Sequence, residues 1–60
     1  MSEVYDYFQQ GRRHLRKGMA AQATVPLEKA KRREPNKASI RESLGIAYFR
    51  IGRYEEAAAE

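Results

Sequence analysis

The stretch LGIAYFRIGRYEEAAAE, residues Leu44–Glu60, carries the clearest structural pattern in this chain of 60 residues. Its first part places apolar residues at intervals of three and four, as on the sides of an α-helix, and Gly52 stands where such a helix would end. The following YEEAAAE consists of helix formers. The stretch therefore predicts a helix, a glycine turn and the beginning of a second helix.

The rest of the chain repeats this arrangement. A shift of 34 residues overlays 4–26 on 38–60 and aligns four pairs of identical residues: Gly11 with Gly45, Arg16 with Arg50, Gly18 with Gly52, and Ala23 with Ala57. Two of the aligned glycines stand at predicted helix ends, and the other small residues stand where helices would touch closely. The positions of the identities indicate an internal repeat.

Chain breakers and hydrophobic periodicity divide the chain into four helices, so the expected fold class is all-α. Their expected ranges are about 3–17, 20–33 and 37–51, with a fourth that begins at Tyr54. Ser2 and Asn36 are expected to cap the first and third helices, because short polar side chains accept hydrogen bonds from free backbone N–H groups. Pro35 ends the second helix.

Pro26 falls inside the second helix. A proline there removes the hydrogen bond to the Gln22 carbonyl and crowds the preceding turn. We expect a kink or a late helix start near Thr24, and favour the kink because Ala20 and Ala23 already belong to the apolar stripe. That stripe comprises Ala20, Ala23, Leu27 and Ala30.

These residues resemble the tetratricopeptide repeat, whose pattern of 34 residues is W-x2-L-G-x2-Y, then A-x3-F, then P. The second copy matches it at Leu44, Gly45, Tyr48, Gly52, Tyr54 and Ala57. The first copy matches more loosely at Tyr7, Gly11, His14, Ala23, Leu27, Ala30 and Pro35. Gln10 replaces the leucine of the first copy, and Arg41 replaces the tryptophan of the second.

The resemblance covers residues 4–60 and implies a single domain, 1–60, built as a right-handed α-solenoid of antiparallel helix-turn-helix repeats. Repeat one would span about 4–37 and an incomplete repeat two about 38–60. In this family the concave face binds peptides or protein partners. The positions that the resemblance assigns to it are Tyr5, Phe8, Arg12, Leu15, Arg16, Glu42, Ile46, Phe49 and Arg50.

That set suits an amphipathic helix or an extended segment with apolar anchors and an acidic flank, because its apolar members would lie beside its arginines. An alternative stays open for Phe8 and Leu15, which would equally serve the contact between the helices of the chain itself. For Ile46 and Phe49 we favour an interface.

The two ends of the predicted stack differ. The third helix has an apolar stripe (Ile40, Leu44, Ala47, Tyr48, Ile51) and a separate apolar pair, Ile46 and Phe49, as expected for a helix covered on two sides. The first helix is polar where the third carries its stripe, as in a terminal repeat. We therefore expect the N-terminal piece of a longer repeat protein. It would self-associate as a homo-oligomer, such as a dimer with or without helix exchange, through Ile40, Leu44, Ile51 and Tyr54.

Composition points away from catalysis. The chain has no cysteine and one histidine, His14, which we interpret as packing against the neighbouring helix. We expect no enzyme activity, cofactor or metal site. A third of the residues are charged, and no apolar stretch is long enough to cross a membrane, so a cytoplasmic location is expected.

Basic residues support an alternative partner. The net charge is +4, and RRHLRK (Arg12–Lys17) and KAKRR (Lys29–Arg33) are the basic clusters. Each lies at a helix C-terminus, where cations complement the helix dipole. Binding of nucleic acid or another polyanion is one alternative to protein binding. A purely structural role as the N-terminal cap of a longer solenoid is another.

Overall fold

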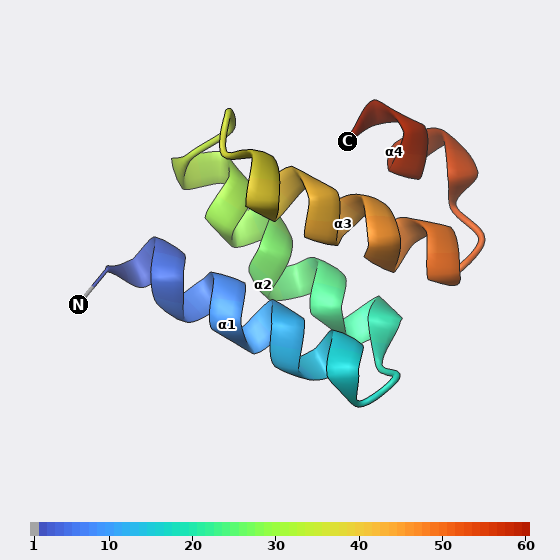
Figure 1. Ribbon diagram of the computed structural model, residues 1–60, viewed down its shortest axis with the longest axis horizontal. Coiled ribbons are helices and arrows are strands. Elements are labelled where there is room, and N and C mark those ends of the chain that lie inside the picture. The colour runs from blue at the N-terminus through green and yellow to red at the C-terminus, as the bar shows by residue number, and fades with distance from the viewer. Residues whose placement is uncertain (1) are drawn as a thin grey trace.

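The computed structural model describes residues 2–60, and this part of the chain forms four α-helices without a strand. They are α1 (Glu3–Arg16), α2 (Ala20–Arg33), α3 (Ala38–Arg50) and α4 (Tyr54–Ala59), shown in Figure 1. The expected all-α class is confirmed, and each expected helix is present. Observed and expected ends agree closely because the breakers that set them act locally.

The turn after α1 closes through Gly18, which adopts a left-handed backbone with φ of 75°. The Met19 N–H donates to the His14 carbonyl at 2.8 Å, and the Gly18 N–H donates to the Leu15 carbonyl at 3.1 Å. This pair of bonds is the Schellman motif, which satisfies the last carbonyls of a helix and favours glycine at the left-handed position.

The turn after α3 has the same geometry, 34 residues later. Gly52 has φ of 81°, the Arg53 N–H donates to the Tyr48 carbonyl at 2.9 Å, and the Gly52 N–H donates to the Phe49 carbonyl at 3.1 Å. The sequence repeat is therefore also a repeat of turn structure.

The two predicted N-caps have different outcomes. Ser2 caps α1 as expected, since its hydroxyl accepts the Tyr5 N–H at 3.4 Å. The prediction for Asn36 is wrong: Lys37 precedes α3, and its side chain makes no capping bond. Asn36 lies in a turn that the Lys37 N–H closes by donating to the Glu34 carbonyl at 3.2 Å. It is thus one residue too early to cap the helix.

Pro26 lies inside a continuous helix. α2 begins at Ala20, so the alternative of a late start near Thr24 is wrong. The proline is buried, as are all four residues of the expected apolar stripe. Burial of the ring adds apolar area to the same side of the helix and offsets part of the cost of the missing hydrogen bond.

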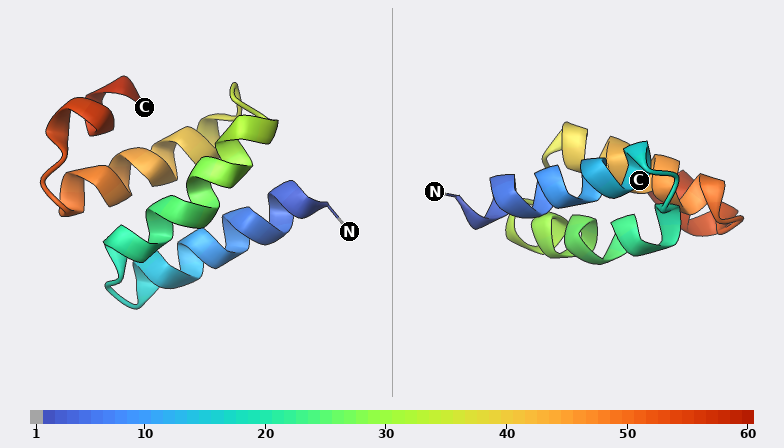
Figure 2. Two further views of the ribbon diagram at one scale, coloured as in Figure 1. Left: turned by 180° about the vertical axis from the view of Figure 1, so that it is seen from behind. Right: turned by 90° about the horizontal axis from the view of Figure 1, so that it is seen from below.

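The helices form two layers. α2 packs against α1 on one side and α3 on the other, and α4 packs against α3. Figure 2 shows α2 in a layer opposite α1 and α3, with α1 and α4 on opposite sides of the molecule. The central core comprises Ala23, Leu27, Leu44, Ala47 and Tyr48.

Small residues set the distance between α1 and α2. Gly11 is buried, and a Cβ atom placed on it would lie 2.3 Å from Cγ of Leu27, far inside van der Waals contact. The close approach lets α1 pack directly on the alanine-rich stripe of α2.

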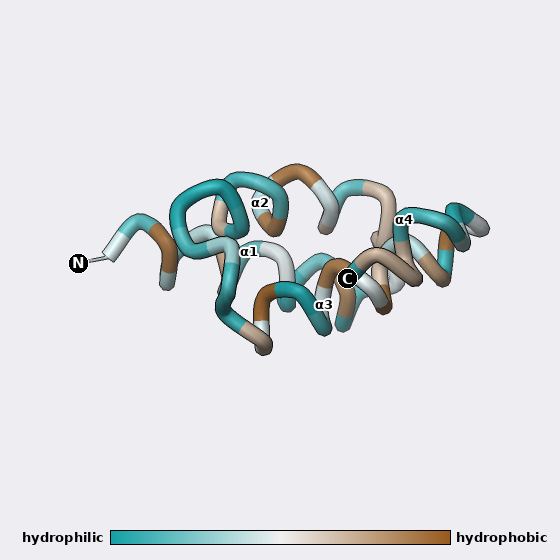
Figure 3. Tube along the Cα trace, turned by 90° about the horizontal axis from the view of Figure 1, so that it is seen from above, coloured by the Kyte–Doolittle hydropathy of each residue, from teal (hydrophilic) through white to brown (hydrophobic). Residues whose placement is uncertain are grey.

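The two apolar sides of α3 have different environments. Its stripe faces the core, and Ile40 and Leu44 are 1% and 0% exposed. The separate pair is on the surface, where Ile46 is 41% and Phe49 64% exposed. Figure 3 shows apolar positions along α3 and at the end of α4, with hydrophilic residues in the turn between α2 and α3.

These burial values bear on the four residues that the sequence assigned to self-association. Ile40 and Leu44 are covered by their own chain, and Leu44 lies in the core cluster with Ala23 and Leu27 of α2. Ile51 is half-buried against the same cluster. Of the four residues assigned to a second chain, Tyr54 alone is largely exposed, at 62%. Without helix exchange, a second chain could therefore reach little of Ile40 or Leu44.

Candidate functional site

A shallow groove runs between α1 and α3, and we call it the inner groove. Its volume is ≈ 350 Å³. The residues that line it are Phe8, Arg12, Leu15, Arg16, Ser39, Glu42, Ser43, Ile46 and Arg50. The structure thus brings together seven of the nine residues that the sequence assigned to a binding face.

The floor of the inner groove is apolar. Phe8 and Leu15 are half-buried and pack against the core, so they serve the contact between helices and also present part of their surface to the groove. Ile46 contributes a more exposed side chain from α3. Since all three stand on helices, the floor is fixed before any partner arrives.

The rim of the inner groove is positively charged. Arg12 lies over the Phe8 ring at 5.6 Å, and Arg50 donates from Nη1 to the Leu15 carbonyl at 3.1 Å. Arg16 is exposed beside them. Across residues 2–60, the ion pairs include none of these three arginines and do not include Glu42. The groove therefore has three guanidinium groups and one carboxylate whose charge is available to a partner.

A wider groove lies between α3 and α4, and we call it the outer groove. Its volume is ≈ 1000 Å³. Its lining residues are Asn36, Ala38, Arg41, Glu42, Gly45, Ile46, Phe49, Arg50, Tyr54, Ala57, Ala58 and Glu60. Three of them also line the inner groove, so this part of α3 is a ridge between the two.

An aromatic pair dominates the outer groove. The rings of Phe49 and Tyr54 meet edge to face, with centroids 5.4 Å apart and planes at 66°. Phe49 was assigned to the concave face and Tyr54 to self-association, but the structure places them together. Tyr5, the remaining residue of the predicted binding set, is 57% exposed and lies in a separate depression near the start of α1.

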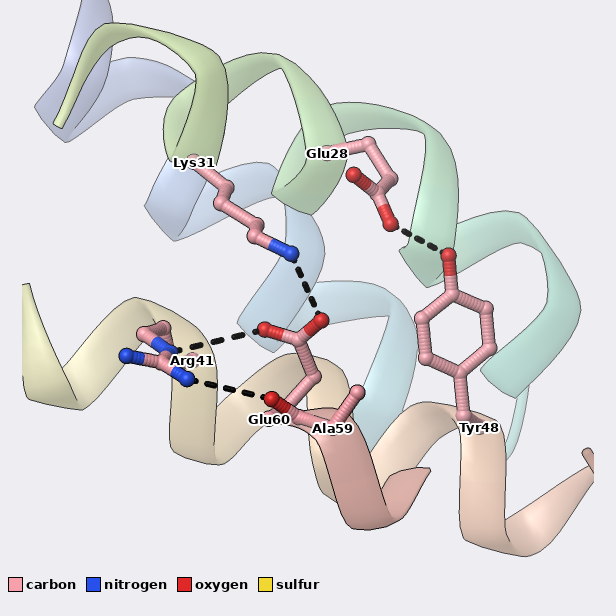
Figure 4. A network of polar contacts seen from close by, with 6 residues as sticks. All are labelled: Glu28, Lys31, Arg41, Tyr48, Ala59 and Glu60. Carbon is pink, nitrogen blue, oxygen red and sulfur yellow. Dashed lines mark hydrogen bonds and ion pairs between the residues drawn. The ribbon is translucent and has the colours of Figure 1, made fainter. Parts of the chain in front are cut away.

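An ion network anchors the end of α4, and sequence reasoning missed it (Figure 4). The Glu60 carboxylate is 4% exposed; its Oε2 lies 2.7 Å from Lys31 Nζ, and its Oε1 lies 3.8 Å from Arg41 Nε. Arg41 also donates from Nη2 to the Ala59 carbonyl at 3.0 Å. The network joins α2, α3 and α4. Its members are far apart in sequence, so no local pattern signals it.

Tyr48 makes a second buried polar contact between helices. Its hydroxyl donates to the Glu28 carboxylate, and Arg53 lies over its ring at 5.2 Å. Burial raises the pKa of Tyr48 to about 12, and the hydrogen bond to Glu28 adds to the rise. These contacts hold α3 on α2 and lie away from both grooves.

Within 2–60, no three histidine, cysteine, aspartate or glutamate side chains gather where they could bind a metal ion. His14 is half-buried on α1, and its Nδ1 is buried without a hydrogen-bond partner in that same range. Of the helices in this part of the chain, none combines the length and apolar character needed to cross a membrane.

Comparisons of the chain with models of protein families, with curated proteins and with solved structures find no match.

Proposed function

We propose that this chain is a protein-interaction module of the tetratricopeptide type, part of a right-handed α-solenoid. The two Schellman turns at Gly18 and Gly52 support the proposal, since they recur at the repeat length of that family. The alternation of helices between two layers supports it as well (Figure 2). The location we propose with it is the cytoplasm.

The proposed ligand is a peptide segment with apolar anchors and an acidic flank, bound in the inner groove. The observation that carries this proposal is the placement of Arg12, Arg16 and Arg50, without carboxylate partners within residues 2–60, beside the apolar floor. An acidic segment would pair with these cations while its apolar side chains bury against Ile46 and Phe8. Because the groove stands on helices, binding does not bear the cost of ordering it.

Nucleic acid fits this surface less well. Binding of single strands needs free aromatic faces on which bases stack. Among the described residues that line the inner groove, Phe8 is the one aromatic ring, and Arg12 already lies over it. A protein segment is therefore the favoured partner.

The proposal is tested with two labelled amphipathic peptides that share leucines at positions i, i+4 and i+7 but carry glutamates or lysines elsewhere. In fluorescence anisotropy we expect the acidic peptide to bind and the basic one not to. Replacing Arg12 and Arg16 by glutamine should weaken binding by about tenfold or more. Ile46→Ser should also weaken binding while helicity, followed by circular dichroism, persists.

The matched control is Arg13→Gln with Lys17→Gln. Arg13 stands on the same helix and Lys17 is its C-cap residue; both are exposed and lie outside the inner groove. The control should leave affinity for the acidic peptide nearly unchanged. Equal binding of both peptides, or equal loss in the control, would contradict the proposal. Tighter binding to single-stranded RNA with a steep salt dependence would favour the polyanion alternative.

A structural role would give a different result again. If the exposed apolar residues serve only to hold the chain together, replacing Ile46 and Phe49 by serine would abolish helicity and assembly at once. The peptide proposal predicts that helicity survives, because both side chains are more than one-third exposed.

A further inference from the structure

We infer that two copies of this chain form a closed dimer through α3. The helices would run antiparallel about a two-fold axis near Ile46, so that Glu42 of each copy meets Arg50 of the other. This inference goes beyond the peptide-binding function, and it uses exposed residues of α3 in place of the buried Ile40 and Leu44.

The aromatic pair in the outer groove offers an exposed apolar surface that a second copy could cover. Phe49 and Tyr54 are 64% and 62% exposed, and Ile46 beside them is 41% exposed. Large side chains gathered on one surface with a polar surround are typical of interfaces, and aromatic residues are enriched at interface centres. Covering this surface would bury apolar area that the chain by itself leaves in water.

Head-to-tail stacking of copies is unfavourable. If a second copy stacked as α3 stacks on α2, its α1 would present the residues equivalent to the buried stripe of α3. Four of the five equivalent residues are Asp6, Gln10, Arg13 and Lys17, and each of these four is exposed. Stacking would bury two cations, an aspartate and an amide at positions where α3 has apolar residues, and such burial is unfavourable without partners. A symmetric contact, in which both copies use the same surface, avoids this.

The charges of Glu42 and Arg50 favour an antiparallel pairing of α3 with α3 of a second copy. Glu42 and Arg50 stand four residues before and four residues after Ile46, so both lie about 6 Å from it along the helix axis. All three line the outer groove and belong to one i±4 ridge, the kind of ridge that commonly packs between helices. Antiparallel pairing about Ile46 sets each Glu42 against the partner's Arg50. Parallel pairing would set like charges against each other.

Both charges are available for this contact. Neither Glu42 nor Arg50 forms an ion pair within residues 2–60. Arg50 uses one guanidinium nitrogen on the Leu15 carbonyl, which leaves its other nitrogens for a carboxylate. The dimer would thus have two charge pairs around a centre formed by Ile46 and Phe49.

The test uses two single charge reversals, Glu42→Arg and Arg50→Glu, studied by analytical ultracentrifugation over a range of concentrations. The unaltered chain should reach a dimer and stop there. Either variant alone should dimerise at least about tenfold more weakly, because like charges then meet across the axis. An equimolar mixture should form a one-to-one heterodimer, since every reversed charge then meets an opposite one.

The chain that carries both reversals should dimerise within about threefold of the unaltered chain, because complementarity is restored. Circular dichroism of each variant checks that the fold is kept; both positions are exposed, so we expect no change. A clean monomer at high micromolar concentration would overturn the inference. So would polymers that grow beyond a dimer, or a mixture that associates no better than its components.

The dimer and the binding of the acidic peptide can be tested separately. Replacing Arg12 and Arg16 by glutamine should weaken the acidic peptide but leave the dimer intact, because neither residue lines the outer groove. Failure of the dimer with the peptide result intact would overturn this inference alone.

Discussion

Gly11 and Gly45 stand at equivalent positions of the two repeats but have different surroundings. A Cβ on Gly11 would lie 2.3 Å from Cγ and 2.6 Å from Cδ2 of Leu27. A Cβ on Gly45 would meet the Ala57 carbonyl oxygen at 3.5 Å and Glu60 Cβ at 3.6 Å, which are ordinary contacts. The same residue type therefore serves close packing in the first repeat but not in the second.

We predict opposite effects when each glycine becomes alanine. Gly11→Ala should lower the free energy of unfolding by about 1–3 kcal/mol, because the methyl group forces α1 away from α2. Gly45→Ala should raise it by up to about 1 kcal/mol, because alanine favours a helix interior more than glycine does. Urea unfolding followed by circular dichroism measures both. Equal destabilisation by the two substitutions would show that the packing at Gly11 is not special.

Tyr48 makes stability depend on pH at the alkaline end. Burial raises its pKa to about 12 from the ordinary 10.0, so the folded chain holds the phenol proton more tightly than the unfolded chain. This contribution to the free energy of unfolding is complete below pH 10 and is lost as the pH rises from about 10 to about 12.

The check is urea unfolding at stepped pH in the unaltered chain and in Tyr48→Phe. At neutral pH the variant should lose about 1 kcal/mol with the hydrogen bond to Glu28. Above pH 10 the gap between the two proteins should narrow, because only the unaltered chain has this proton to lose. Lysines titrate in the same range but do so in both proteins, so a gap of constant size would refute the assignment.

α4 is the element most dependent on its surroundings. It has six residues, fewer than an isolated helix needs to be stable in water. Ala57 packs it against the core, and Arg53 donates to Glu56 at 2.9 Å, which lowers the pKa of the Glu56 carboxyl. The buried Glu60 carboxylate then ties its end to α2 and α3.

We predict that Glu60→Gln loosens α4 selectively. Lys31 and Arg41 lose their carboxylate partner, so amide hydrogen exchange in α4 should accelerate while exchange in α2 stays slow. The global loss should be about 1 kcal/mol, because both cations remain partly exposed to water. Glu55→Gln is the control, since Glu55 is exposed and outside the ion pairs of residues 2–60. Equal acceleration in the control would show that the Glu60 network does not hold α4.

The helices could be predicted from the sequence where nearby residues determine them. Gly18 and Gly52 mark the ends of α1 and α3 because a left-handed residue closes each helix, and the stripe of α2 is buried as its spacing predicts. Contacts between elements were harder. Ile40 was assigned to a partner because periodicity reveals that α3 has two apolar sides but not which one packs on α2. The contacts of Glu60 depend on where α4 folds back onto α2 and α3, and no local sequence pattern predicts that position.

The core of the whole molecule is small, and half of its buried hydrophobic residues among those described are alanines. Leu27, Ile40 and Leu44 are the largest side chains that are fully buried among the described residues. A chain of this length buries only about 60% of the surface that its unfolded form exposes. An interface over Ile46, Phe49 and Tyr54 would therefore matter for stability as well as for recognition, and the melting temperature would rise with protein concentration.

The order in which the helices touch also has a kinetic meaning. Each helix packs chiefly on its neighbour in sequence, α1 on α2, α2 on α3 and α3 on α4. Loops that must close before a contact forms are therefore short, and low contact order of this kind is associated with folding in microseconds to milliseconds. Folding can begin with any two helices that are adjacent in sequence, and the remaining helices can then pack onto them one after another. A substitution at one end should then change the local rate of opening there and leave the other end almost undisturbed.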